Sequence, residues 1–369
     1  MDEDSDARGR PVERDTEMTE VPAAAEPPSG ARRFGWKRLV GGGLGLAVII
    51  GTFVFILPQV ANYRDVWDVV KELSWAQIGL LLGATALNLA TYAPPYQAAL
   101  PGLRFRQAFV MTQASTASTY VLPGGAAVGM GASFGMLRAW GFRGKPVTLA
   151  IAVVGIWNQF AMLGYPIIAL ALLTAANEQH ALLQTVAFIG LAIFLLTAGG
   201  FAAGLASARL ANWVGDLAAR IVTWLLRIIR RGPVTWDGRS FVSFRNDAVG
   251  LLSRRWHVLT LATLAGHLTV FLLFLISLRV LDVTPAEVSG IEAFATWSLV
   301  RLLGSIPITP GGIGIVELGF TTLLVGFGGE NAEVVAAVLV YRFLTIVPTL
   351  VLGLLAGATW KLHRPAGAG

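Results

Sequence analysis

The chain has 369 residues, of which 55% are hydrophobic and 14% are charged, with a mean hydropathy of +0.65, no cysteine and a net charge of +6. Soluble domains carry about 25% charged residues, so these values exclude a disordered protein, a coiled coil and an ordinary soluble enzyme, and the lack of cysteine excludes disulfides and thiolate metal sites. Long unbroken apolar runs favour an all-α, polytopic membrane protein over a membrane β-barrel.

The N-terminal residues 1–30 contain nine acidic residues, three arginines and four prolines. Such a segment cannot bury enough apolar surface to fold alone, so we expect a disordered acidic tail. A cluster of arginines and a lysine follows within residues 32–38, directly before the first apolar run. By the positive-inside rule this cluster, and with it the N-terminus, should be cytoplasmic.

About 20 apolar residues are needed for a helix to cross a bilayer. Six segments are long enough for full transmembrane helices, namely 39–57, 76–100, 146–173, 182–206, 257–280 and 334–360. Two further apolar segments, 105–141 and 291–328, are interrupted by proline and glycine.

The charges of the connecting loops orient these segments. Basic residues flank both ends of segment 105–141, which places both ends inside. Segment 291–328 is flanked by acidic loops without lysine or arginine, which suits the outside. Each interrupted segment therefore should enter and leave on one side, as a re-entrant hairpin. The C-terminal Lys361 and Arg364 return the chain to the cytoplasm, and the whole pattern predicts a multi-pass protein of the cell membrane.

This layout contains an inverted repeat. A first membrane repeat covers 31–206, and a second, opposite in direction, begins at about 182 and ends with 257–364. The two hairpins share a tripeptide, Pro123-Gly124-Gly125 in the first and Pro310-Gly311-Gly312 in the second. Paired breaks in corresponding halves of a transporter indicate a binding site near the bilayer midplane. The alternative is that both breaks are helix kinks that serve packing only.

Residues 207–256 form a basic segment with an amphipathic pattern. Apolar residues, two of them tryptophans, recur at helical spacing over 210–228, and arginines occupy the other face. This pattern favours a helix at the membrane surface, with arginines near anionic headgroups. A cytoplasmic helix packed on the protein's own loops is the alternative. The positive-inside rule already explains the basic charge, so no nucleic-acid partner is expected.

Three ionisable residues stand out inside the apolar segments, namely Arg301, Glu317 and Arg342. Such residues are costly in a bilayer and usually have partners or functions. The break at Pro310 should start a half-helix whose N-terminus favours an anion. Glu317 can pair with either arginine and leave the other for a phosphate, which arginine binds in a bidentate manner. The alternative is a buried structural cluster without a ligand. Together with Arg301, Glu317 and Arg342, the candidate binding residues are Pro310, Gly311, Gly312, Gly314, Pro123, Gly124, Gly125 and Arg138.

Other polar residues give weaker signals. The first hairpin arm is polar at Gln113, Ser115, Thr116, Ser118 and Thr119, which either line a cavity or bond between helices. We interpret His267, in the middle of its predicted helix, as a packing residue rather than a proton relay. The four histidines are scattered, so neither a metal site nor another cofactor is expected, and no catalytic constellation is visible.

The second hairpin and the last helix carry the motif Arg301-x5-Pro307-x-Thr309-Pro310-Gly311-Gly312-x-Gly314-x-x-Glu317, followed by Tyr341-Arg342. This motif resembles that of the transmembrane, flippase-like domain of lysylphosphatidylglycerol synthases and its stand-alone relatives. The resemblance covers about 35–360 and is specific within 301–348. In the family the first hairpin often carries Gly-Glu after its Pro-Gly and then an arginine; here the acid is missing and Arg138 comes later.

The resemblance implies translocation of a phospholipid or lipid-linked molecule between leaflets, and we expect this chain to lack the soluble synthase domain. No ATP-binding motif is present, so movement would be passive or driven by an ion gradient. Expected partners are membrane lipids, mainly with anionic headgroups, a separate soluble transferase, or a second copy of the chain. The alternative functions are the membrane subunit of a lipid-modifying transferase and a non-transporting scaffold.

Overall fold

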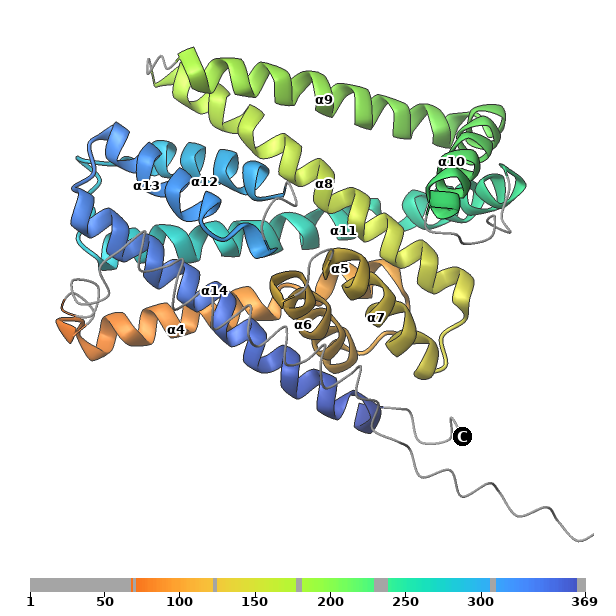
Figure 1. The fold of residues 1–369 in the computed structure, drawn as a ribbon, viewed down its shortest axis with the longest axis horizontal. Coiled ribbons are helices and arrows are strands. Elements are labelled where there is room, and N and C mark those ends of the chain that lie inside the picture. Colours follow the sequence, from red (N-terminus) through yellow and green to blue (C-terminus); the bar gives the residue numbers. More distant parts are fainter. Residues whose placement is uncertain are drawn as a thin grey trace, which may run out of the picture. The chain divides into compact units, whose positions relative to one another are not determined.

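The computed structural model describes residues 68, 71–121, 125–176, 181–228, 238–305 and 310–363. These residues belong to one compact unit, Leu44–Gly369. All regular secondary structure in them is helical (Figure 1), which confirms the all-α prediction. The predicted acidic tail, the basic cluster and the first predicted span, 39–57, lie outside the described residues.

Five segments of the described chain are long and apolar enough to cross a membrane. They coincide with the other five predicted spans, and the protein is therefore a multi-pass membrane protein. The elements that contain these segments are α4 (Trp75–Ala90) with α5 (Pro94–Ala99), α8 (Gly144–Ala175), α9 (Ala181–Ala206), α11 (Gly238–Val280), and α14 (Asn331–Thr359) with the short 3-10 helix η3 (Trp360–His363).

The first helical segment is broken between α4 and α5. Ser74 caps α4 by accepting from the backbone N–H of Gln77. At the other end Pro94 and Pro95 form the first turn of α5. Pro94 has no N–H to donate to the carbonyl of Ala90, so the hydrogen bonds of α4 cannot continue through it, and the chain turns at Thr91 and Tyr92. The break turns these two polar residues toward the interior of the bundle.

The first hairpin consists of α6 (Phe105–Val121) and α7 (Gly125–Ala139), which pack along each other. The outer ends of both arms lie at the C-terminal end of α14. The Gln107 amide donates to the carbonyl of His363 at 3.1 Å, and the Trp140 indole donates to the carbonyl of Trp360 at 3.1 Å. We call this the basic end of the bundle, because it gathers Arg104, Arg106, Arg138, Arg143, Lys145 and Lys361.

The second hairpin consists of α12 (Gly290–Gly304), the 3-10 turn η2 (Pro310–Gly312) and α13 (Ile315–Phe327). Its outer ends meet at the opposite end of the bundle, where a Cβ on Gly329 would lie 3.2 Å from the Val288 side chain. This is the acidic end, with Asp282, Glu287, Glu292, Glu330 and Glu333. The two hairpins thus approach from opposite ends, as the loop charges predict. Their depth in a bilayer and the inverted repeat remain predictions.

The tips of the two hairpins touch. Gly311 in the turn of the second hairpin lies against the ring of Tyr120 near the tip of the first, and a Cβ on Gly311 would come within 2.4 Å of the Tyr120 Cδ1 atom. Tyr120 in turn packs on Ile346 and Leu350 of α14. The two turns therefore share one region in the interior of the bundle.

The basic segment forms two helices. The amphipathic part is α10 (Ala208–Ile228), and residues 238–256 are the first half of α11, which begins at Gly238 rather than at the predicted residue 257. The polar first half of α11 continues without a break into its apolar half, so hydropathy alone does not mark its start. α11 contacts α4, α5, α8 and α14 and so lies at the centre of the packing (Figure 1).

Candidate functional site

Glu317 and Arg342 form a buried ion pair at the tip of the second hairpin. Arg342 Nε donates to Glu317 Oε1 at 2.5 Å, and the two side chains are 9% and 1% exposed. The Nη2 atom of Arg342 also donates to the carbonyl of Gly311 at 3.0 Å. The second carboxylate oxygen, Glu317 Oε2, accepts from the backbone N–H of Gly314 at 2.7 Å. The pair therefore holds both ends of the turn that leads into α13.

This turn needs glycine at the positions where the sequence has it. The φ angles of Gly311 and Gly312 are 64° and 68°, in the left-handed region that a side chain disfavours. Gly312 also lies so close to Gly304 and Val316 that a Cβ would fall 2.8 Å from the Val316 side chain. Left-handed backbone and close packing together explain the repeated glycines. Pro310 begins the same turn.

Glu317 supplies the anion at the start of α13. The sequence predicts that this half-helix N-terminus would favour a bound anion, and α13 begins at Ile315 with Glu317 in its first turn. The carboxylate of Glu317 accepts there from the N–H of Gly314, so the protein's own side chain satisfies this donor. Of the two pairings open from the sequence, Glu317 makes the one with Arg342, and Arg301 is left apart from the pair.

Arg301 lies in the last turn of α12, and none of the described carboxylates lies within salt-bridge distance of it. Its guanidinium stacks on the fully buried Trp297 ring at 5.2 Å from the ring centroid, a cation–π contact. Its Nη2 atom lies 3.4 Å from Nδ1 of His267. The aromatic ring and the imidazole thus orient a cation whose charge they do not neutralise.

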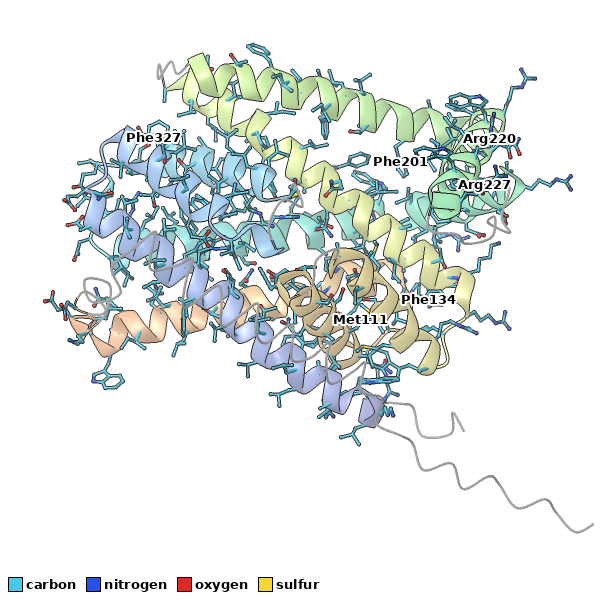
Figure 2. All side chains as sticks on the ribbon, viewed as in Figure 1. Met111, Phe134, Phe201, Arg220, Arg227 and Phe327 are labelled. Carbon is cyan, nitrogen blue, oxygen red and sulfur yellow. The ribbon has the colours of Figure 1, made fainter. Side chains whose placement is uncertain are left out.

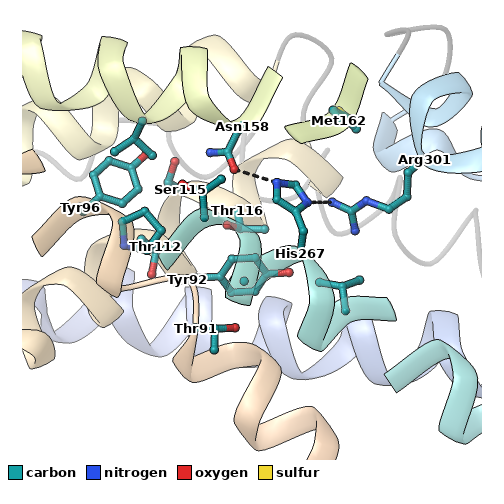
Figure 3. A pocket seen from close by; sticks show the side chains of 15 residues that line it. Thr91, Tyr92, Tyr96, Thr112, Ser115, Thr116, Asn158, Met162, His267 and Arg301 are labelled. Carbon is teal, nitrogen blue, oxygen red and sulfur yellow. Dashed lines mark hydrogen bonds between the residues drawn. The ribbon is translucent and has the colours of Figure 1, made fainter. Parts of the chain in front are cut away.

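The hydrogen bonds of His267 determine which of its nitrogens carries the proton. Arginine has only donors, so His267 Nδ1 must accept from Arg301. The Nε2 atom, 3.0 Å from Asn158 Oδ1, then carries the hydrogen and donates to that oxygen. The ring is therefore neutral and fixed between α8 and α12, and it presents a lone pair to Arg301 (Figure 3).

Arg301 and His267 line a cavity of about 240 Å³ between α5, α6, α8 and α11. Figure 3 shows hydroxyl groups from several helices around it. Arg301 is the only charged side chain among the described residues that line it. The hydroxyl of Thr263, which is 2% exposed, has no hydrogen-bond partner within the described chain. The polar lining residues also include Asn158, Thr91, Tyr92, Tyr96, Thr112, Ser115 and Thr116.

The other residues predicted for the site fall into three groups. Pro123 and Gly124 lie outside the described residues. Gly125 starts α7 against α6, where a Cβ would come within 1.9 Å of the Ser118 carbonyl oxygen, so it serves close packing of the hairpin arms. Arg138 is exposed at the basic end, where it donates to the carbonyl of Phe142 at 2.8 Å, and it does not line the cavity.

The polar arm of the first hairpin divides between the two roles left open by the sequence. Ser115 and Thr116 line the cavity. Ser118 bonds between the hairpin arms, because its hydroxyl donates to the carbonyl of Gly125 in α7 at 2.9 Å. Thr119 has neither role, since it donates to the carbonyl of Thr116 in its own helix at 2.6 Å. Gln113 is fully buried and donates to the carbonyl of Leu89 at 3.3 Å.

A model of a protein family matches most of the chain. The model of the lysylphosphatidylglycerol synthase transmembrane region matches residues 43–353. The chain belongs to this family. The matched range includes both hairpins, the Glu317–Arg342 pair and all residues that line the cavity. A search of the curated proteins found no match. Family membership and the five apolar helices together identify a membrane protein of a lipid-modifying family.

The family residues and the cavity residues are largely different sets. The motif that carries the resemblance contains Arg301, which faces the cavity, and Glu317 and Arg342, which hold the hairpin tip. His267, Asn158 and Tyr92 line the cavity but are not part of that motif. The sequence does contain a signal for the helix break at Tyr92, because Pro94-Pro95 interrupts the apolar run two residues after Tyr92. The contact between His267 and Arg301 joins residues 34 positions apart and has no sequence signal.

Proposed function

We propose that the protein binds the anionic headgroup of a phospholipid or lipid-linked phosphate at Arg301 and moves it between the two leaflets. The observation that carries this proposal is Arg301, which lies in a polar cavity between the membrane helices and has no carboxylate partner among the described residues. An unpaired charge in such a place is costly. An anionic ligand would compensate it, and a guanidinium binds phosphate through two parallel hydrogen bonds.

The size of the cavity supports a headgroup rather than a whole lipid. Its volume of about 240 Å³ is below the roughly 300–1,000 Å³ of drug-sized sites. The hydroxyls of Thr91, Ser115 and Thr116 would bond the remaining headgroup oxygens. Acyl chains would stay in the hydrocarbon outside the cavity. This division suits a translocator, which has to shield the headgroup only.

In this proposal the two family arginines have different roles. Arg301 touches the ligand. Arg342 and Glu317 hold the turn at Gly311, and with it the position of α13 relative to α12. Arg342 is therefore a positioning residue, whose guanidinium is already engaged by a carboxylate and a carbonyl.

Leaflet exchange in proteoliposomes tests the proposal. Fluorescent phosphatidylglycerol and phosphatidylcholine are each followed with the wild type, Arg301→Gln, Arg301→Lys and the exposed Arg104→Gln as a matched control. Charge-assisted hydrogen bonds contribute about 1.5–3 kcal/mol, so Arg301→Gln should slow exchange of phosphatidylglycerol by about tenfold to a hundredfold, and Arg301→Lys by less. Arg104→Gln should exchange lipid as the wild type does.

Two results would overturn the proposal. One is equal exchange by the wild type and Arg301→Gln. The other is no exchange of anionic, zwitterionic or polyprenyl-phosphate lipids by a folded wild-type protein, which would favour a scaffold or a transferase subunit. Thermal unfolding with short-chain phosphatidylglycerol separates binding from movement, because a ligand that binds the folded state raises its stability. That rise should be absent in Arg301→Gln.

A further inference from the structure

Helix α10 carries an apolar surface that no described residue covers. Trp213, Ile221 and Trp224 are 55%, 49% and 62% exposed. At about 100° per residue they fall within a sector of about 80° on one side of the helix. Apolar side chains this large are rarely exposed together on a soluble surface. We call this surface the tryptophan face of α10.

Three arginines border the tryptophan face. Arg209, Arg220 and Arg227 are exposed and fall within about 20° of one another, directly beside Trp213 on the helical wheel. Figure 2 shows Arg220 and Arg227 extending away from the neighbouring helices. The only acidic residue of α10 is Asp216. A row of arginines beside an apolar stripe complements a lipid bilayer surface, where anionic headgroups lie above apolar acyl chains.

The rotation of α10 is fixed by contacts on its opposite side. Gly215 lies so close to α11 that a Cβ would come within 2.7 Å of the Phe241 ring. Asp216 accepts from the backbone N–H of Gly238 at 2.8 Å and from the side chain of Asn212 at 3.1 Å. Asp216 thereby satisfies a donor at the start of α11. Its two carboxylate oxygens are engaged there and not by the neighbouring arginines. The tryptophan face has to point away from α11.

The level of α10 along the bundle follows from its neighbours. Arg245 of α11 donates to the last carbonyls of α9, Leu205 at 2.8 Å and Ala206 at 3.3 Å. Lys145, in the first turn of α8, forms an ion pair of 2.8 Å with Asp247. The ends of two membrane helices therefore meet α11 at residues 245–247, and α10 begins at this level, directly after α9.

We infer that α10 lies on the membrane surface at the basic end and binds the anionic headgroups there. Trp213, Ile221 and Trp224 enter the boundary between headgroups and acyl chains, and Arg209, Arg220 and Arg227 bind lipid phosphates. Interfacial helices of this composition bury their apolar face about 5–10 Å into that boundary. This site is separate from the cavity at Arg301 and does not depend on the proposed transport.

The lack of cysteine allows a direct test, because a single introduced cysteine can be labelled alone. Trp224→Cys carries a nitroxide, and Asn246→Cys, exposed on α11, serves as the control. Collisions with oxygen and with a water-soluble nickel complex report depth in the bilayer. Each labelled protein is placed in phosphatidylcholine vesicles with and without phosphatidylglycerol, and again with Arg209, Arg220 and Arg227 replaced by glutamine.

We expect the label at position 224 to favour oxygen over nickel and to lie about 5–10 Å below the phosphates when phosphatidylglycerol is present. Replacing the three arginines, or adding salt, should reduce this dependence on phosphatidylglycerol. The control label should remain accessible to nickel in every vesicle. A label at 224 that is accessible to nickel in all vesicles would overturn the inference. So would a label shielded from both reagents, which would indicate a protein partner or a second copy on this face.

Discussion

Arg342 of α14 and Glu317 of α13 are 25 residues apart in the chain, and their ion pair closes the turn of the second hairpin. One guanidinium joins the carboxylate of Glu317 to the carbonyl of Gly311, and the same carboxylate holds the N–H of Gly314. No other described pair of opposite charges is buried to this degree. The two arginines of the family motif, Arg301 and Arg342, therefore have different surroundings, and they should respond differently to substitution.

Removing one member of the ion pair should destabilise the protein. Arg342→Met leaves the Glu317 carboxylate buried without its cation, and the cost for a broken buried pair is about 3–5 kcal/mol. Arg301→Met removes no ion pair and should lower the melting temperature much less. Thermal unfolding of the purified protein in detergent compares the two. The double variant Glu317→Met with Arg342→Met should recover part of the loss, since no unpaired charge remains; equal losses in the single and double variants would contradict the pairing.

His267 should matter for Arg301 and hardly for folding. In His267→Phe the ring remains but offers Arg301 no acceptor, so the guanidinium loses its orientation. We expect weaker binding of short-chain phosphatidylglycerol, by about tenfold for a hydrogen bond to a charged group. His267→Gln, whose side-chain oxygen accepts, should restore part of the affinity. Titration by calorimetry measures both variants. Equal affinity in His267→Phe and the wild type would show that the imidazole does not position Arg301.

Gly125 should be intolerant of a side chain because α6 and α7 are closest there. Its Cβ would overlap the Ser118 carbonyl, whereas a Cβ on Gly131 of the same helix meets nothing within 4 Å. Overpacking costs about 1–3 kcal/mol, so Gly125→Ala should lower the melting temperature. Gly131→Ala should keep it or raise it, since alanine favours the helix. A similar effect of both substitutions would mean that helix propensity, rather than this approach, determines the outcome.

Gly311 should be sensitive for two reasons. An alanine there would be strained at a φ of 64°, and its Cβ would meet the ring of Tyr120. Gly311→Ala should therefore reduce both thermal stability and lipid exchange. Tyr120→Ala in the same chain relieves the steric overlap but not the backbone strain, so only part of the stability should return. Gly357→Ala in α14, where a Cβ meets nothing within 4 Å, is the matched control.

The sequence was sufficient for the membrane helices and for the ends at which the hairpins begin. Apolar length predicts the five spans in the described chain, and the loop charges agree with the basic and acidic ends. The start of α11 was missed because its first half is polar but continuous with the membrane helix. The surface tryptophans of α10, such as Trp224, are exposed in the structure, in agreement with the amphipathic pattern.

The charged residues of the site could be predicted from the sequence, but which of them contact one another could not. Arg301, Glu317 and Arg342 are conspicuous because charge is rare in apolar segments. Which arginine binds Glu317 depends on how α14 packs on α13, and no spacing in the sequence fixes that packing. His267 lacks a signal for a similar reason, since its neighbours Asn158 and Arg301 come from two other helices. Arg138 carries the expected charge but lies exposed, donating to the carbonyl of Phe142.

The contact between Tyr120 and Gly311 links two hairpins that enter the bundle from opposite ends. If one hairpin shifts along the bundle, the other has to follow or the tyrosine ring has to leave the glycine. In the proposed translocator the two hairpins therefore cannot shift independently while this contact is kept. A covalent link between positions 120 and 311 should then slow lipid exchange without unfolding the protein.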